Sequence, residues 1–171
     1  MVKGYAAMRS ISYIVDEDGH KRMTLNGKPL FQYGPLDQGW WPDGLYTAPS
    51  DEALAFDIIK TKEMGYNLIR KHVKVEPARW YWHCDRLGML VWQDMPSIAD
   101  NEANKWGNRA YDTGTDYPVD EEGKANYYKE WGEIINAFKV FPCIVAWVPF
   151  NEAWGQFDTD EAVKFTRLQD P

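Results

Sequence analysis

The residues best placed for chemistry are Asn151 and Glu152, which end an apolar run at residues 144–150. Four to eight apolar residues bounded by turn signals predict a strand buried on both faces, as in a parallel sheet. Ligands bind at the carboxyl ends of such strands. Glutamate is rarely buried without a partner, so Glu152 beside Trp147 and Trp154 is expected to have a perturbed environment, which suits a general acid. The alternative is an exposed glutamate that caps the following turn.

The composition bounds the class of function. The chain has 171 residues, 44% of them hydrophobic, which is enough for one sizeable core and too few for two ordinary domains. A net charge of −7 without any run of Lys or Arg argues against a nucleic-acid partner. No apolar run approaches the roughly 18 residues of a membrane span, so no membrane partner is expected. The sequence carries no targeting signal, which leaves bacterial cytoplasm, periplasm and secretion open.

Cysteine and tryptophan are the two informative residue types. Cys84 and Cys143 lie in apolar segments, which predicts two reduced thiols in the core rather than a disulfide framework. The chain holds nine tryptophans, and flat aromatic faces are what sugar rings stack on. Trp40, Trp41 and Trp154 are therefore candidate stacking platforms, with packing in the core as the alternative for all three.

Hydrophobic periodicity and turn signals predict the organisation of the chain. Residues 8–15 and 21–25 indicate two short strands around a turn, the possible end of an earlier domain. Strand and helix patterns then alternate four times. The predicted strands are residues 30–34, 66–70, 89–93 and 143–148, and the predicted helices start after Ser50, at Pro77, near Tyr127 and after Asp158. This alternation predicts an α/β fold with a parallel sheet, and the polar residues 96–123 predict a functional loop.

Three ordered motifs resemble the catalytic barrel of glycoside hydrolase family 2, the β-galactosidase and β-glucuronidase group. They are YNLIRKH at residues 66–72, CDRLGMLVW at residues 84–92 and WVPFNE at residues 147–152. The resemblance covers nearly the whole chain and implies a (β/α)8 TIM barrel, which takes about 250 residues when complete. We therefore expect only the first four βα units, a partial barrel over residues 25–171, preceded at residues 1–24 by the end of a β-sandwich domain and a linker.

The resemblance also implies roles for individual residues. Asn151 and Glu152 match the pair that ends the fourth barrel strand, with Glu152 as general acid and base and Asn151 hydrogen-bonded to the 2-hydroxyl of the sugar. Arg70 matches the arginine that ends strand two and holds catalytic carboxylates in place; its alternative is a surface ion pair. The family often has a histidine three residues after this arginine, where Val73 stands here. His72 is thus either a sugar ligand or a structural histidine.

Two aspartates fall at the same predicted edge of the sheet. Asp37 follows the first predicted strand and Asp94 follows the third, and either could bind sugar hydroxyls. Aspartate is equally common as a turn residue, so both interpretations stay open.

The chain shows only one of the two carboxyls that a retaining glycosidase needs. These carboxyls stand about 5 Å apart, one as acid and base and the other as nucleophile. The resemblance places the nucleophile on the seventh strand, beyond Pro171. We therefore expect part of a retaining hydrolase of terminal β-glycosides, β-galactosidase-like, which binds a β-linked sugar, needs no cofactor and is nearly inactive as this chain alone.

Three alternatives remain. A non-catalytic carbohydrate-binding half-barrel would use the aromatic edge without any nucleophile. Two copies could associate as a homo-oligomer that completes eight strands, because a half-barrel leaves strand edges exposed. A metal-dependent hydrolase using His72, Asp94 and Glu152 is disfavoured, since no paired-histidine spacing occurs. We predict no metal in the catalytic step.

Overall fold

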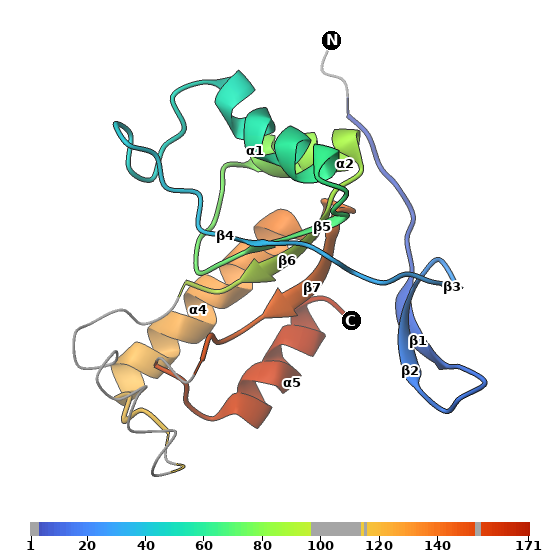
Figure 1. Ribbon diagram of the computed structural model, residues 1–171. Helices are drawn as coiled ribbons and strands as arrows, with labels where there is room; N and C mark the ends of the chain where they lie inside the picture. The colour runs from blue at the N-terminus through green and yellow to red at the C-terminus, as the bar shows by residue number, and fades with distance from the viewer. Residues whose placement is uncertain (1–3, 97–113, 115, 153–154) are drawn as a thin grey trace.

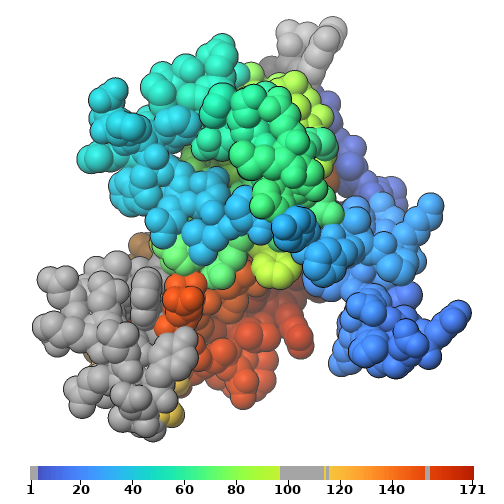
Figure 2. All heavy atoms as spheres, viewed as in Figure 1, coloured from blue at the N-terminus to red at the C-terminus, as the bar shows by residue number. Residues whose placement is uncertain are grey.

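The computed structural model describes residues 4–96, 114, 116–152 and 155–171. Within them a four-stranded parallel sheet with flanking helices forms the main body, and a three-stranded antiparallel sheet lies to one side of it (Figure 1). In the space-filling view the antiparallel sheet, in blue, projects from the main body (Figure 2). The predicted α/β class with a parallel sheet is confirmed.

The antiparallel sheet consists of β1 (Ile11–Val15), β2 (Lys21–Leu25) and β3 (Lys28–Pro29). Asn26 and Gly27 join β2 to β3 with φ angles of 52° and 75°, a conformation that these two residue types adopt readily. The two strands predicted at the start of the chain are therefore confirmed.

The parallel sheet alternates with helices along the chain. Its strands are β4 (Leu36–Asp37), β5 (Leu68–Lys71), β6 (Leu90–Asp94) and β7 (Ile144–Val148). The helices are α1 (Asp51–Glu63), α2 (Ala78–Leu87), α4 (Glu121–Phe138) and α5 (Thr159–Gln169). Each strand pairs in parallel with the next one in the chain, so the spatial order is β4-β5-β6-β7.

The first strand of this sheet begins later than predicted. The prediction placed it at residues 30–34, but the regular ladder starts only at β4. Pro35 has no N–H to donate, which interrupts regular pairing, although the Pro35 carbonyl still accepts a hydrogen bond from Arg70 at 3.0 Å. At Gly34 the backbone lies so close to β5 that a Cβ atom would stand 1.7 Å from the Leu68 oxygen. Only glycine fits there.

Most of the predicted helix ends are confirmed. The Ser50 hydroxyl accepts a backbone hydrogen bond in the first turn of α1, at 3.2 Å. Helix α2 follows Pro77 and ends at Gly88, whose φ of 70° is left-handed. Asp158 does precede α5, but its side chain makes no cap; its carboxylate binds the Lys124 ammonium at 2.6 Å instead.

Two clusters form the hydrophobic core. One lies between α1, α2 and the sheet, and consists of Ile58, Ile69, Trp80, Tyr81, Cys84, Met89, Val91, Cys143 and Ile144. The other lies around α4 and α5, and consists of Met95, Tyr127, Trp131, Ile135, Phe157 and Ala162. Trp147 of β7 packs against both.

The predicted burial of the two cysteines is confirmed, and burial raises the pKa of the Cys143 thiol. Among the described helices, none has the length and apolar composition needed to cross a membrane.

The close approach at Gly34 gives a stability prediction. Gly34→Ala forces a methyl group into the backbone of β5 and is expected to lower the free energy of unfolding by about 2 kcal/mol or more. Urea denaturation followed by tryptophan fluorescence measures this change. Gly4→Ala is the matched control, because a Cβ atom at Gly4 meets nothing within 4 Å. Equal stability of the two variants would contradict the tight contact.

Candidate active site

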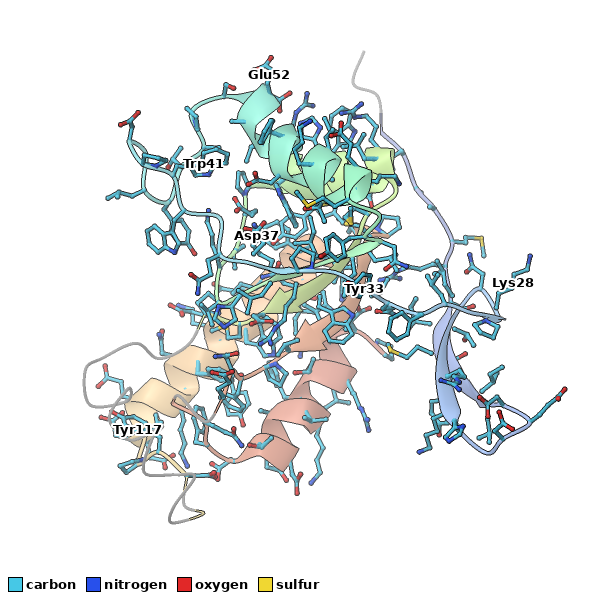
Figure 3. The ribbon with its side chains drawn as sticks, viewed as in Figure 1. Lys28, Tyr33, Asp37, Trp41, Glu52 and Tyr117 are labelled. Carbon is cyan, nitrogen blue, oxygen red and sulfur yellow. The ribbon has the colours of Figure 1, made fainter. Side chains whose placement is uncertain are left out.

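The predicted site residues come from the carboxyl ends of all four parallel strands. Asp37 is the last residue of β4, Arg70 lies in β5, and Asp94 is the last residue of β6. Asn151 and Glu152 lie in the segment that follows β7. Figure 3 shows Asp37 where β4 leads into the loop that carries Trp41.

The Arg70 guanidinium joins two of these strand ends. Its Nε and Nη2 atoms donate to the two oxygens of Asp94 at 3.0 and 2.8 Å, and Nη2 also donates to Asn151 Oδ1 at 2.8 Å. Asp94 is fully buried. A buried carboxylate needs a partner with matching geometry, and the planar fork of arginine provides it. The interaction ties β5, β6 and the segment after β7 together.

The Asn151 side chain is left with a free donor. Because Arg70 carries donors only, the Asn151 oxygen faces it and the Nδ2 group points elsewhere. Nδ2 is buried and has no hydrogen-bond partner among the described residues. A buried donor without a partner costs stability, and functional sites are one place where this cost is accepted.

Glu152 is exposed, in contrast to the residues before it. Phe150 stacks on Tyr127 with ring centroids 5.0 Å apart, and the Tyr127 hydroxyl donates to the Pro149 carbonyl at 2.7 Å. Burial raises the pKa of Tyr127, so it remains a donor. Glu152 itself has a left-handed φ of 43°. The aromatic residues therefore anchor the segment but do not bury the carboxylate, and the expected enclosure of Glu152 is not seen in the described part of the chain.

Val73 contacts the ion pair of Arg70 and Asp94, whereas His72 contacts Gln38. Val73 has a φ of 46°, a left-handed angle that costs a β-branched residue roughly 1–3 kcal/mol. In this conformation its N–H donates to Asp94 Oδ2 at 3.3 Å. His72 is buried, and its Nδ1 lies 3.1 Å from the amide nitrogen of Gln38, within hydrogen-bond distance. Its hydrogen bond thus goes to Gln38, and its role as a sugar ligand stays a prediction.

The other predicted ligands differ in exposure. Both oxygens of Asp37 have partners, the Gly39 N–H at 2.8 Å and the Lys71 ammonium at 2.7 Å. Trp40 is 59% exposed, as a stacking platform must be. Trp154 lies outside the described residues. Sugar contact by Asp37, Asp94 and Trp40 stays a prediction.

Sequence reasoning missed a set of buried charges that begins at the last residue of β5 and continues directly after it. Lys71, Lys74 and Glu76 are all nearly inaccessible, and the Glu76 carboxylate lies 2.9 Å from each of the two ammonium groups. The signal was present in the sequence, since opposite charges two and five residues apart follow a buried strand at once. The apolar pattern gave no reason to place charged side chains inside.

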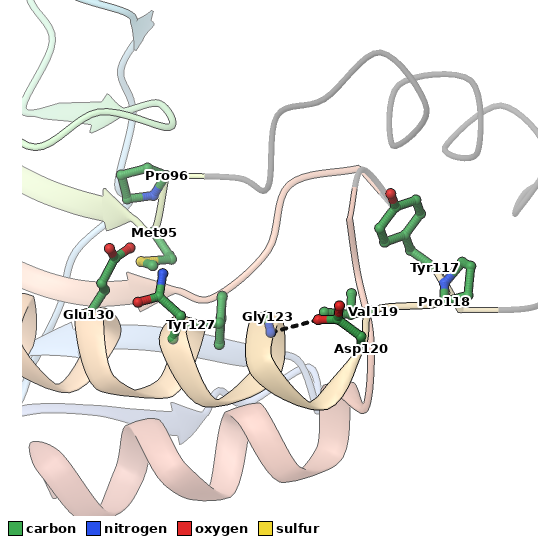
Figure 4. Close-up of a pocket in the computed structure, with 10 residues that line it drawn as sticks. Met95, Pro96, Tyr117, Pro118, Val119, Asp120, Gly123, Tyr127 and Glu130 are labelled. Atoms are coloured by element: carbon green, nitrogen blue, oxygen red, sulfur yellow. Dashed lines mark hydrogen bonds between the residues drawn. The ribbon is translucent and has the colours of Figure 1, made fainter.

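A separate pocket of about 500 Å³ lies beside the end of β6 and the first turns of α4 (Figure 4). Its lining includes Met95, Tyr117, Asp120 and Glu130. Asp120 is already engaged, because its carboxylate accepts from the Gly123 N–H at 2.7 Å. None of the predicted site residues that the structure describes lines this pocket, so we do not identify it with the site.

Comparison with known proteins shows one family. The model of the family "Glycosyl hydrolases family 2, TIM barrel domain" matches residues 18–171. A search of the curated proteins found no match.

Solved structures of this family superpose on the chain. The exo-chitosanase CsxA of Amycolatopsis orientalis does so with a TM-score of 0.67 and 18% identity, over 95% of this chain and 18% of that one. β-Glucuronidase 2 of Bacteroides uniformis gives 0.64 and 26%, over 96% and 18%. The GH2 β-galacturonidase of Eisenbergiella tayi gives 0.69 and 21%, over 97% and 27%. The chain thus spans only 18–27% of the length of these proteins.

The Arg70 fork gives a second stability prediction. Arg70→Lys keeps the charge but cannot bind both Asp94 oxygens and Asn151, so we expect a loss of about 2 kcal/mol in the free energy of unfolding. Arg79→Lys is the matched control: Arg79 makes the same bidentate contact with Asp51 at the surface, where solvent screens the charges and a clearly smaller loss is expected. Urea denaturation compares them, and equal losses would contradict the special role of Arg70.

Proposed function

Because the chain belongs to glycosyl hydrolase family 2, we propose that it forms the first half of the barrel of a retaining β-glycosidase, with Glu152 as general acid and base. The observation that carries this proposal is the Arg70 fork, which fixes Asn151 beside Glu152 at the carboxyl edge of the sheet. The strand order supports a partial barrel, since strands that follow each other in the chain are direct neighbours and β4 and β7 lie at the two ends of the sheet.

The proposed reaction has two steps. In the first, protonated Glu152 gives its proton to the glycosidic oxygen, the bond from the anomeric carbon to that oxygen breaks, and a second carboxylate bonds to the anomeric carbon. In the second, the Glu152 carboxylate takes a proton from water, the water oxygen bonds to the anomeric carbon, and the second carboxylate leaves.

The second carboxylate is proposed to come from residues outside this chain. Asp94 and Asp37 are the other acidic residues of the described strand ends, and cations occupy both: Arg70 binds Asp94, and Lys71 binds Asp37. Both oxygens of each carboxylate already accept hydrogen bonds from this chain, so neither is placed to attack a sugar. We therefore assign Asp94 a positioning role through Arg70, and not attack on the sugar.

Asn151 is proposed to hold the sugar. Its buried Nδ2 donor has no partner among the described residues, so a hydroxyl acceptor of the substrate would satisfy it. The 2-hydroxyl is the group that the proposed role requires, and hydrogen bonds to this hydroxyl strengthen in the transition state of glycoside hydrolysis.

The proposed substrate is a terminal β-linked sugar. The similar structures include an exo-chitosanase, a β-glucuronidase and a β-galacturonidase, enzymes named for different sugars. A β-galactosidase is one kind of enzyme that cleaves terminal β-linked sugars. We propose this general class of substrate and not galactosides alone. The domain boundary after residue 24 also remains a proposal. β2 and β3 pair with each other across this point of the chain.

The role of Glu152 is tested in the full-length protein. Glu152→Gln should lower kcat at least about a hundredfold on a β-glycoside with a poor leaving group, because the proton donor is lost. The first step on a 2,4-dinitrophenyl β-glycoside needs less acid assistance and stays fast in this variant. The second step lacks its general base and becomes slow, so a burst of dinitrophenol followed by slow turnover is expected. A panel of galactoside, glucuronide, galacturonide and glucosaminide identifies the usable sugar.

Glu17→Gln, which changes an exposed glutamate of the β1–β2 turn, is the control and should leave kcat unchanged. Normal turnover by Glu152→Gln would overturn the assignment of the acid. Sugar binding without turnover in the unaltered full-length protein would favour the non-catalytic binding role.

A further inference from the structure

Residues 39–46 form a small closed loop after β4, which we call the aromatic lobe. Trp41 and Leu45 close it by exchanging two backbone hydrogen bonds of 2.8 and 2.9 Å. The rings of Trp40 and Tyr46 meet edge to face at 5.3 Å, yet 59% and 44% of these residues remain exposed. A pair of exposed aromatic rings at the carboxyl edge of a parallel sheet suits stacking on the apolar face of a sugar ring.

Lys74 holds this lobe at both ends. Its ammonium group donates to the Gly39 carbonyl at 2.5 Å and lies 4.6 Å from the centroid of the Tyr46 ring. The next residue, Val75, donates its N–H to the Tyr46 hydroxyl at 3.4 Å. The lobe is therefore fixed to the segment that follows β5.

The lysine is itself held by buried charges. Glu76 pairs with Lys74 and with Lys71, each at 2.9 Å, and Lys71 also binds Asp37 at 2.7 Å. Gly39 packs directly on this cluster, because a Cβ atom there would stand 2.4 Å from a Glu76 oxygen. Such close backbone contact leaves the start of the lobe little freedom to move.

One glutamine connects the lobe to the Arg70 group. The Gln93 amide of β6 donates to the Lys74 carbonyl at 2.7 Å and to the Asp94 carbonyl at 2.8 Å. Its oxygen accepts from the Tyr81 hydroxyl at 2.5 Å, so every polar group of this buried side chain is used. The segment that contains Lys74 and the backbone of Asp94, whose carboxylate binds Arg70, are thus fixed to the same side chain.

We propose that Lys74 and Tyr46 are positioning residues of the site, which hold Trp40 as the platform on which the sugar ring of the substrate stacks. The proposal rests on the function proposed above and deepens it. Lys74 acts through the lobe and does not touch the substrate. A purely structural role for the same cluster would lower stability without changing substrate affinity of the folded protein.

The kinetic test uses the full-length protein and the 4-nitrophenyl β-glycoside of the panel that it hydrolyses fastest. Trp40→Ala, Lys74→Met and Tyr46→Ala should each raise KM about tenfold, while kcat stays within about twofold, because stacking acts on binding. The double variant with Trp40→Ala and Tyr46→Ala should show a KM no higher than about twice that of Trp40→Ala alone, because both changes remove the same platform.

Tyr46→Ala keeps the test valid where Lys74→Met fails to fold. Lys74→Met leaves a buried Glu76 with one cation fewer, whereas Tyr46→Ala removes only a half-exposed ring and keeps all buried ion pairs. Tyr13→Ala is the matched control, since Tyr13 is also an exposed tyrosine with a lysine, Lys21, 5.0 Å from its ring centroid, but lies in β1 of the other sheet. It should leave KM unchanged.

Hydrogen exchange gives a readout that does not depend on activity. The amides of Trp41 and Leu45, which close the lobe, should exchange at least about tenfold faster in Tyr46→Ala and at the wild-type rate in Tyr13→Ala. Unchanged exchange in Tyr46→Ala would overturn the positioning role of Tyr46 and Lys74. Faster exchange with unchanged KM would overturn the platform role of Trp40. Full turnover by Glu152→Gln would instead reject the proposed function. The exchange rates would still decide on their own whether Tyr46 holds the lobe.

Discussion

A single buried ion pair organises the carboxyl edge of the parallel sheet. Asp94 is removed from water at the end of β6, which carries a large desolvation cost unless donors replace the lost water. The Arg70 fork and the strained N–H of Val73 together supply three such donors. Because the same guanidinium also binds Asn151, the geometry of the segment after β7 depends on a charge that is buried at the end of the neighbouring strand, β6.

The same edge also holds strained backbone positions and unpaired polar groups. Val73 and Glu152 both have left-handed φ angles, and both lie beyond strand ends. Among the described residues of this edge, Trp41, Glu76 and Asn151 each retain a buried polar atom without a hydrogen-bond partner. The two hydrophobic clusters below contain none of these residues. Stability therefore comes from the helix-covered part of the sheet, while the carboxyl edge carries the costs that accompany function in folded proteins.

The sequence predicts the elements of this fold better than their polar contacts. Alternating apolar periodicity located each helix and three strands of the parallel sheet, since those patterns reflect burial against a common core. The first strand of the parallel sheet, β4, was predicted too early in the chain. Gly34 and Pro35 interrupt the regular pairing before it, and its position is set by pairing with β5. The buried position of Lys74 was also missed. Its partner Glu76 lies only two residues away, but the other groups that hold the lysine, Gly39 and Tyr46, are distant in sequence.

Asn151 and Glu152 differ in how the described residues surround them. Asn151 is buried and oriented by residues of this chain, so the binding role proposed for it needs no rearrangement of its side chain. Glu152 is exposed, and a general acid needs surroundings that favour its protonated form, which burial or a neighbouring carboxylate supplies. In the proposed mechanism the partner of Glu152 is the second carboxylate, which attacks the anomeric carbon and stands about 5 Å from the acid.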